Sequence, residues 1–430
     1  MSEIIVGIDL GTTNSEIALY RDGRPAVLAD DAARLILPSV VGLADDGSLL
    51  VGEEARNQYL LHPERTVRSI KRRMGRDEKV RLGERDYAPQ EISAMILRRL
   101  KEIAEARLGH PVVKAVITVP AYFSDAQRQA TREAGEIAGL EPVRILNEPT
   151  AAALTYEAGH REGKRVVVYD LGGGTFDVSV VRIEDGVVEV ISGHGNNHLG
   201  GDDFDARLVG HILDHLKIKQ GIDVSGDLRA MARISRAAET AKKRLSVEAY
   251  CPVAEEYLTE ASGKPVHLSL EITRPEYEEM ISPFIEETLE AVHVALTGAG
   301  MAVSEVDEIL LVGGATRTPL VQRRLEETFG LAPRGEVDPD LCVALGAAIQ
   351  GAAIAGEEVS AVLVDVTPYS FGISVLGELD GDLYPYRFAP IIHKNTPIPV
   401  CRSEMFSTTF DEVPSGLAPD PDRRHRSALA

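Results

Sequence analysis

Two glycine-rich segments of the same design constrain what this chain can fold into. One occupies residues 165–181 and reads RVVVYDLGGGTFDVSVV, and the other occupies residues 4–19 and reads IIVGIDLGTTNSEIAL. In both, a β-branched run typical of a strand meets Asp-Leu-Gly, then small residues, then a second apolar run. Each segment therefore predicts two strands joined by a tight turn. Because the design occurs twice, we expect a duplicated fold that holds its ligand between two halves.

The two turns have the composition of a phosphate site. Glycine has no Cβ, so its backbone N–H groups can approach phosphate oxygens closely. The candidate donors are Gly11, Thr12, Thr13 and Asn14 in the first turn and Gly172, Gly173, Gly174 and Thr175 in the second. A single triple glycine would fit a purely structural hairpin equally well, and the second copy favours the phosphate site.

Carboxylates flank both turns. Asp9, Asp170 and Asp177 are candidates to hold Mg²⁺, which we expect to be bound through its waters because Mg²⁺ dehydrates reluctantly. A Walker loop and a dinucleotide-binding fingerprint are both disfavoured. In those motifs the glycines directly precede a helix, whereas the glycines of this chain connect one strand to the next.

Composition narrows the class of protein. The chain has 430 residues, of which 44% are hydrophobic and 26% charged, as in a globular protein of two or three domains. Its net charge of −21 argues against general binding to nucleic acid or to anionic membranes. Cys251, Cys342 and Cys401 form no CxxC pair, which predicts neither a disulfide framework nor a zinc site. With no long apolar run and no leader pattern, we expect a cytoplasmic protein.

A longer internal repeat supports the duplication. Residues 115–119, a helix at 125–138 opened by Ser124 and stopped by Gly139, and an alanine-rich helix at 151–156 follow one another in the first half. Residues 307–312, 319–329 and 342–351 repeat this order in the second. We therefore predict two homologous lobes, 1–163 and 164–355, whose small-residue helices cross between them.

The remainder of the chain changes character. Residues 356–366 form a short apolar run after two acids, as in a linker that adds to a sheet edge. Residues 367–413 alternate like strands, and residues 414–430, rich in Pro, Asp and Arg, predict disorder.

Single residues remain open to two interpretations each. Phosphoryl transfer needs positive charge and an oriented water, for which Lys71 and Glu148 are candidates. Yet the basic run around Lys71 also fits a solvated helix face, and Glu148 fits an acid at a helix N-terminus.

Three further segments are also ambiguous. Residues 313–317 fit either close approach of the backbone to a base or the packing of a strand against a helix, and the charged residues of 236–246 fit an ordinary exposed helix face. His194 and His198 lie among glycine and asparagine, which indicates a loop rather than a metal site.

The motifs, taken together, resemble the DnaK-type seventy-kilodalton heat-shock chaperones. They are GIDLGTTNS at 7–15, ITVPAYF at 117–123, NEPTAAA at 147–153, DLGGGTFD at 170–177, HLGG at 198–201 and VGGATR at 312–317. This resemblance implies an α/β fold of duplicated actin-like, ribonuclease H-like ATPase lobes around a nucleotide cleft. It implies ATP or ADP with Mg²⁺, with K⁺ as a further candidate ion.

The resemblance also assigns roles. Lys71 and Glu148 match the family's catalytic lysine and glutamate, Asp9 and Asp170 its metal carboxylates, and Thr175 its γ-phosphate hydroxyl. Further residues match its nucleotide contacts, mostly to adenosine, namely Gly201, Glu239, Lys242, Lys243, Ser246, Gly313, Gly314, Arg317 and Asp340. Pro120 and Arg128 match its interlobe relay, and the region where J-domain cochaperones and the linker dock is matched by Arg144, Asn147, Thr150 and Asp365.

Departures from the family pattern bear on function. The segment between Gly75 and Pro89 is shorter than is usual in bacterial members, and the linker reads AVLVD at residues 361–365, where leucines are usual. The family's peptide-binding β-sandwich is matched only over residues 367–411. We therefore expect an ATP-hydrolysing chaperone with J-domain and nucleotide-exchange partners, but impaired binding of client peptides. A sugar or acetate kinase and an actin-like filament protein are alternatives of the same fold class, against which the linker and β segment argue.

Overall fold

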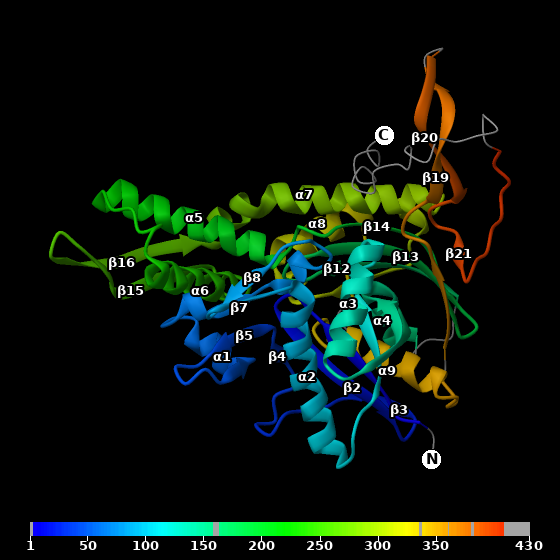
Figure 1. Cartoon of the computed structure of the whole chain (residues 1–430). Coiled ribbons are helices and arrows are strands. Elements are labelled where there is room, and N and C mark those ends of the chain that lie inside the picture. Colours follow the sequence, from blue (N-terminus) through cyan, green and yellow to red (C-terminus); the bar gives the residue numbers. More distant parts are fainter. Residues whose placement is uncertain (1–2, 158–162, 335–337, 360, 380–381, 408–430) are drawn as a thin grey trace.

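Two six-stranded sheets form the frame of the molecule (Figure 1). The computed structural model describes residues 3–157, 163–334, 338–359, 361–379 and 382–407. The first sheet has the order β11-β10-β1-β2-β3, with β4 paired to β2, and the second has the order β17-β12-β13-β14-β18-β21. Their strands are β1 (Ile5–Leu10), β2 (Asn14–Arg21), β3 (Arg24–Val27), β4 (Leu37–Pro38), β10 (Lys114–Val119), β11 (Glu141–Asn147), β12 (Lys164–Leu171), β13 (Phe176–Glu184), β14 (Val187–Asn196), β17 (Glu308–Val312), β18 (Val362–Val366) and β21 (Pro397–Ile398).

The pairing of strands confirms the duplication. β1 is antiparallel to β2 and parallel to β10, and β12 is likewise antiparallel to β13 and parallel to β17. The two glycine-rich turns therefore occupy equivalent places, each at the end of a central strand. We call the first sheet with its helices lobe I and the second with its helices lobe II.

Helices cover the sheets and extend both lobes. They are α1 (Glu53–Gln58), α2 (Pro89–Leu108), α3 (Asp125–Ile137), α4 (Glu148–Glu157), α5 (Gly201–Gln220), α6 (Leu228–Leu245), α7 (Arg274–Gly298), α8 (Pro319–Phe329) and α9 (Cys342–Ile354), with 3₁₀ turns η1 (Pro63–Arg65), η2 (Ile70–Arg73), η3 (Val303–Glu305) and η4 (Gly314–Arg317). The smaller sheets comprise β5 (Val40–Leu43) with β6 (Leu49–Val51) and β7 (Thr66–Arg68), β8 (Val80–Leu82) with β9 (Arg85–Tyr87), and β15 (Tyr250–Ala261) with β16 (Lys264–Thr273). No helix of the described residues is both long and apolar enough to cross a membrane.

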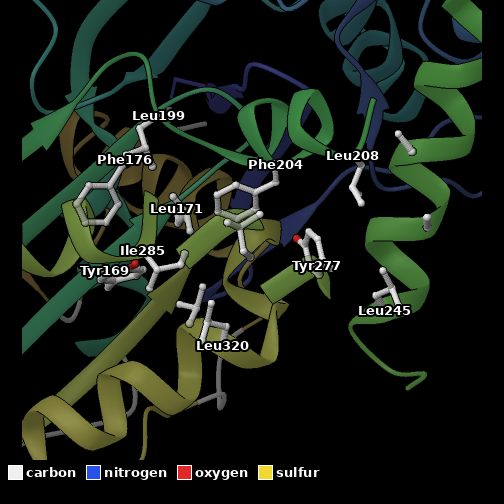
Figure 2. Close-up of a cluster of buried hydrophobic side chains, with 14 of the residues drawn as sticks. Tyr169, Leu171, Phe176, Leu199, Phe204, Leu208, Leu245, Tyr277, Ile285 and Leu320 are labelled. Carbon is white, nitrogen blue, oxygen red and sulfur yellow. The ribbon is translucent and has the colours of Figure 1, made fainter. Parts of the chain in front are cut away.

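The alanine-rich helices meet between the lobes, as the small residues predict. A Cβ on Gly346 of α9 would lie 1.7 Å from the carbonyl oxygen of Ala151 in α4, and one on Gly7 of β1 would lie 2.1 Å from the amide nitrogen of Ala348. Only glycine allows backbones to approach this closely. Lobe II has its own core beneath the second sheet, in which Tyr169 and Phe176 pack near Phe204 and Ile285 (Figure 2).

The structure shows the local surroundings of Lys71 and Glu148. The basic run is not a solvated helix face: β7 and η2 hold it, and the side chain of Lys71 is buried, because it points toward carboxylates of the cleft. Glu148 is the first residue of α4, so it does lie at a helix N-terminus.

The segment after α9 confirms the edge addition predicted for the linker. β18 pairs in parallel with β14, and β21 then pairs with β18. The hairpin of β19 (Phe371–Leu379) and β20 (Asp382–Ile392) projects beyond the second sheet (Figure 1), and in the part of the chain that the structure describes its strands pair only with each other. The predicted disordered tail, 414–430, lies outside the described residues, and the boundaries proposed for the lobes, linker and β segment stay predictions.

Candidate active site

A cavity between the lobes gathers most of the predicted site. Both glycine-rich turns line it, together with the start of α4 and the loop before α9. Its lining includes the predicted residues Asp9, Gly11, Thr12, Thr13, Asn14, Lys71, Glu148, Asp170, Gly172, Gly173, Thr175, Gly313, Gly314 and Asp340. Residues far apart in sequence thus meet because the repeat places its two turns face to face.

The second turn is held so that its amides face inward. The carbonyl oxygens of Gly172 and Gly173 accept hydrogen bonds from the amides of Gly201 and Asp202, at 2.9 and 2.7 Å. The amides of Gly173, Gly174 and Thr175 have no hydrogen-bond partner among the described residues. In a trans peptide the N–H points opposite to the C=O, so fixing these carbonyls outward aims the amides at the cavity.

The first turn is braced in the same way by Ser39. Its hydroxyl donates to the carbonyl of Gly11 at 2.8 Å, and its amide donates to the carbonyl of Thr13 at 2.8 Å. The hydroxyl of Thr13 is buried without a partner in the described chain. A buried, unpaired hydroxyl beside free amides fits an oxygen-rich anion such as a polyphosphate.

A buried ion pair lies between the two turns. The ammonium of Lys71 donates to Oε1 of Glu148 at 2.5 Å, and both side chains are less than a tenth exposed. Burial raises the pKa of Glu148 to about 7, although the charge of Lys71 opposes this shift. Burial would lower the pKa of Lys71, but the charges of Glu148 and Asp9 outweigh it and raise that pKa. Lys71 is therefore a fixed cation beside a carboxyl that titrates near neutrality.

The three predicted metal carboxylates have different surroundings. Asp9 accepts from the hydroxyl of Thr118 at 2.9 Å, and Asp177 accepts from the amides of Ala121 and Tyr122, both at 3.2 Å. Burial, then the nearby charge of Glu148, raises the pKa of Asp170 well above its ordinary value. Within the described residues no three acidic, histidine or cysteine side chains converge closely enough to hold a metal directly.

The family model described as "Hsp70 protein" matches residues 5–81 and 77–415. The chain is 51% identical over 418 residues to proteins named "Chaperone protein DnaK" from Thermotoga neapolitana, Thermotoga petrophila and Thermotoga maritima. Each alignment covers 95% of this chain and 68% of the relative.

The chain belongs to the Hsp70 family. The predicted family, the fold class and the Hsp70 type of chaperone are therefore confirmed, and the sugar-kinase and filament alternatives fall away. The roles of single residues stay predictions.

Several predicted adenosine contacts of this Hsp70 protein form hydrogen bonds with one another or with Asp205. Lys242 binds Asp205 at 2.7 Å and the carbonyl of Gly201 at 3.0 Å, while Lys243 binds Glu239 at 2.6 Å. The same holds elsewhere in the set: Ser246 donates to the carbonyl of Lys242 at 3.3 Å, and Arg317 donates to Asp340 at 2.7 Å. Of these residues, Gly313, Gly314 and Asp340 line the main cavity, and Glu239 lines an adjoining one with Thr12 and Arg68.

The predicted relay and docking residues form one connected group in this Hsp70 chain. Arg128 donates to the carbonyl of Ala121, next to Pro120, at 2.8 Å, and to the side chain of Asn147 at 2.7 Å. Asn147 and Thr150 donate to Asp365 of the linker at 2.9 and 3.2 Å. Arg144 lies on β11, and its charge counters the rise that burial causes in the pKa of Asp365.

Three residues near the site escaped the sequence reasoning. Glu16 is buried in the cavity wall, opposite Asp9 in the β1–β2 register, so the alternation of strand residues could have revealed it. Thr118 was hidden because its bond to Asp9 joins strands that are distant in sequence. Arg72 was passed over as part of a charged run. The loop predicted for the two histidines is correct only for His198, which follows β14 and bonds Arg76. His194 lies in β14 and bonds the hydroxyl of Tyr122 at 2.9 Å.

Proposed function

We propose that the chain binds Mg·ATP between its lobes and hydrolyses it to ADP and phosphate. One observation carries this proposal: the two opposed turns, the second with free amides at residues 173–175, line the cavity that holds the buried Lys71–Glu148 pair. Phosphoryl transfer to water needs positioning and charge neutralisation more than covalent chemistry, and this arrangement supplies both. The family membership supports the same activity.

The proposed division of roles follows from charge. The amides of residues 173–175 and the hydroxyls of Thr13 and Thr175 bind phosphate oxygens. Lys71 stays protonated and faces the γ-phosphate, while the Glu148 carboxylate orients the attacking water. The bond between the γ-phosphorus and the bridging oxygen breaks as water adds, and ADP leaves with that oxygen. Mg²⁺, held through water by Asp9 and Asp170, would neutralise charge on the β- and γ-phosphates, with K⁺ as a further candidate ion.

We further propose that adenosine lies against α6 and the glycine turn of η4. Lys242, Lys243 and Arg317 would exchange their present acidic partners for contacts with the nucleoside. Glu239, Ser246, Gly314 and Asp340 would complete the pocket. The exposed or half-buried state of these side chains supports such an exchange.

The protein partners of this chain are proposed by analogy with the Hsp70 family. We propose that a J-domain cochaperone docks near Arg144 and the linker, and that an exchange factor opens the lobes to release ADP. Within the part of the chain that the structure describes, β19 and β20 pair only with each other, so we propose that this hairpin by itself binds client peptides weakly. A cytoplasmic location is part of the same proposal.

The test is release of phosphate from Mg·ATP with no acceptor added. We expect slow turnover by the wild-type chain and its loss in Lys71→Ala, with ATP still bound. Turnover that appears only when a sugar is added would overturn the proposal. Binding of a fluorescent hydrophobic peptide, followed by anisotropy, tests the β segment: saturable binding that ATP reverses would contradict impaired client binding.

A further inference from the structure

One arginine of lobe I completes the phosphate cradle of lobe II. Arg72 lies in η2, next to Lys71. Its Nε donates to the carbonyl oxygen of Gly174 at 3.0 Å, and its terminal nitrogen forms a charged hydrogen bond with Asp203. A Cβ on Gly174 would lie 2.9 Å from the same Nε, so the guanidinium lies directly against this glycine.

The bond from Arg72 to the carbonyl of Gly174 comes from lobe I, unlike the bonds that hold the carbonyls of Gly172 and Gly173. The carbonyls of Gly172 and Gly173 are bound by amides of residues 201 and 202, which belong to lobe II like the turn itself. The carbonyl of Gly174 is bound from the opposite lobe. Lobe II alone therefore fixes two of the three peptide planes, and the third is fixed only when the lobes are together.

The third peptide plane, between Gly174 and Thr175, carries the amide that faces the γ-phosphate in the proposed function. The carbonyl of Gly174 and the N–H of Thr175 belong to one trans peptide and point in opposite directions. By holding the carbonyl outward, Arg72 directs the Thr175 amide into the cavity. In the proposed function, on which this inference rests, Thr175 faces the γ-phosphate.

Asp203 anchors the arginine. Its carboxylate also accepts from the amide of Gly200 at 2.8 Å, at the start of α5, so a contact within lobe II holds it as well. The planar fork of arginine can reach two acceptors at once, which a lysine ammonium does less well. Ser69 adds a parallel contact, donating to Asp202 at 2.7 Å.

We infer that Arg72 is a positioning residue that couples closure of the lobes to recognition of the γ-phosphate. Arg72 is not among the residues that line either of the two adjoining cavities, so in this inference it acts without contacting the nucleotide. When the lobes separate, the peptide between Gly174 and Thr175 loses its restraint and can turn its amide away. The turn then keeps the two amides that lobe II holds in place, which suffice for ADP. It loses the oriented amide of Thr175, which distinguishes ATP from ADP.

The experiment measures affinity, by calorimetry with Mg²⁺, for ADP and for an ATP analogue with a β,γ-imido bridge. The ratio of the two affinities is the decisive readout. In Arg72→Ala we expect preference for the analogue to fall about tenfold, as for loss of one oriented charged hydrogen bond, with ADP affinity within about twofold of wild type. Arg72→Lys should recover part of the preference, because it keeps the charge without the fork.

The neighbouring Arg73 is the matched control. It has the same charge in the same turn, but it contacts Glu78 of its own lobe at 3.7 Å. Arg73→Ala should leave both affinities unchanged. Equal weakening of both nucleotides in Arg72→Ala, or an unchanged ratio, would overturn the inference; if that variant fails to fold, Arg72→Lys decides on the same ratio. The readout does not require hydrolysis, so absent phosphate release in the wild type refutes the proposed activity without deciding this inference.

Discussion

Lys71 and Glu148, 77 positions apart in sequence, form a hydrogen bond of 2.5 Å in the floor of the cleft. Lys71 comes from a 3₁₀ turn of lobe I, and Glu148 begins the helix that crosses between the lobes. Because both side chains are buried, each charge depends on the other, and removal of either leaves an uncompensated charge. The pair therefore links the proposed chemistry to the stability of the folded chain.

Lys71→Ala should reduce phosphate release by about a hundredfold or more, because a preorganised positive charge is lost where negative charge develops. Nucleotide binding, measured by calorimetry, should persist through the amides of the two turns. Lys101→Ala is the control, since Lys101 lies in the same lobe but binds only an exposed carbonyl, that of Gly139, and the neighbouring Glu105. Equal loss of binding and hydrolysis in Lys71→Ala would contradict the separate roles.

The rate of hydrolysis in single turnover should rise with pH through about 7, the raised pKa of Glu148, and then level. Hydrolysis by Glu148→Gln should be slow, and its rate should not depend on pH in this range.

The stability of the folded chain should change in the opposite direction and decrease as the pH rises. A carboxyl whose pKa is raised on folding favours the folded state at low pH, and this contribution is lost as pH rises from its ordinary value through about 7. The melting temperature of the wild type should therefore fall relative to Glu148→Gln over that interval; parallel curves would contradict the assignment.

Asp365→Ala should release the linker from lobe I. It removes the acceptor of Asn147 and Thr150, both buried, at a cost of about 1–3 kcal/mol. Limited proteolysis between α9 and β18 should then become about tenfold faster. Glu358→Gln, an exposed change in the same linker, should leave the rate unaltered. Unchanged cleavage in Asp365→Ala would show that the pairing of β18 with β14 suffices to hold the linker.

Gly346→Ala should destabilise the chain by about 3 kcal/mol or more, because the new Cβ would overlap the carbonyl of Ala151 where α9 crosses α4. Gly210→Ala, inside α5 with open space around it, should instead stabilise by about 0.5–1 kcal/mol. Chemical unfolding of both variants measures the difference. A mild effect at Gly346 would mean that the helices can separate without loss of packing.

Local sequence patterns were sufficient to predict those elements whose structure depends mainly on residues close together in the sequence. The β-branched runs around each glycine turn predicted the strands, and Ser124 and Gly139 bounded α3 within one residue. Two copies of one design also predicted the opposed turns, because a repeated segment folds by the same local rules.

Partners distant in sequence decided the rest. The run around Lys71 has the composition of an exposed surface, and only the approach of Glu148 and Asp203 from other elements shows which side chains are buried. By itself, the sequence determined where the strands, the turns and the candidate phosphate donors lie. The tertiary structure decided which charges meet across the lobes, since the Coulomb and hydrogen-bond energies that select these pairs depend on distances in space, which local sequence does not encode.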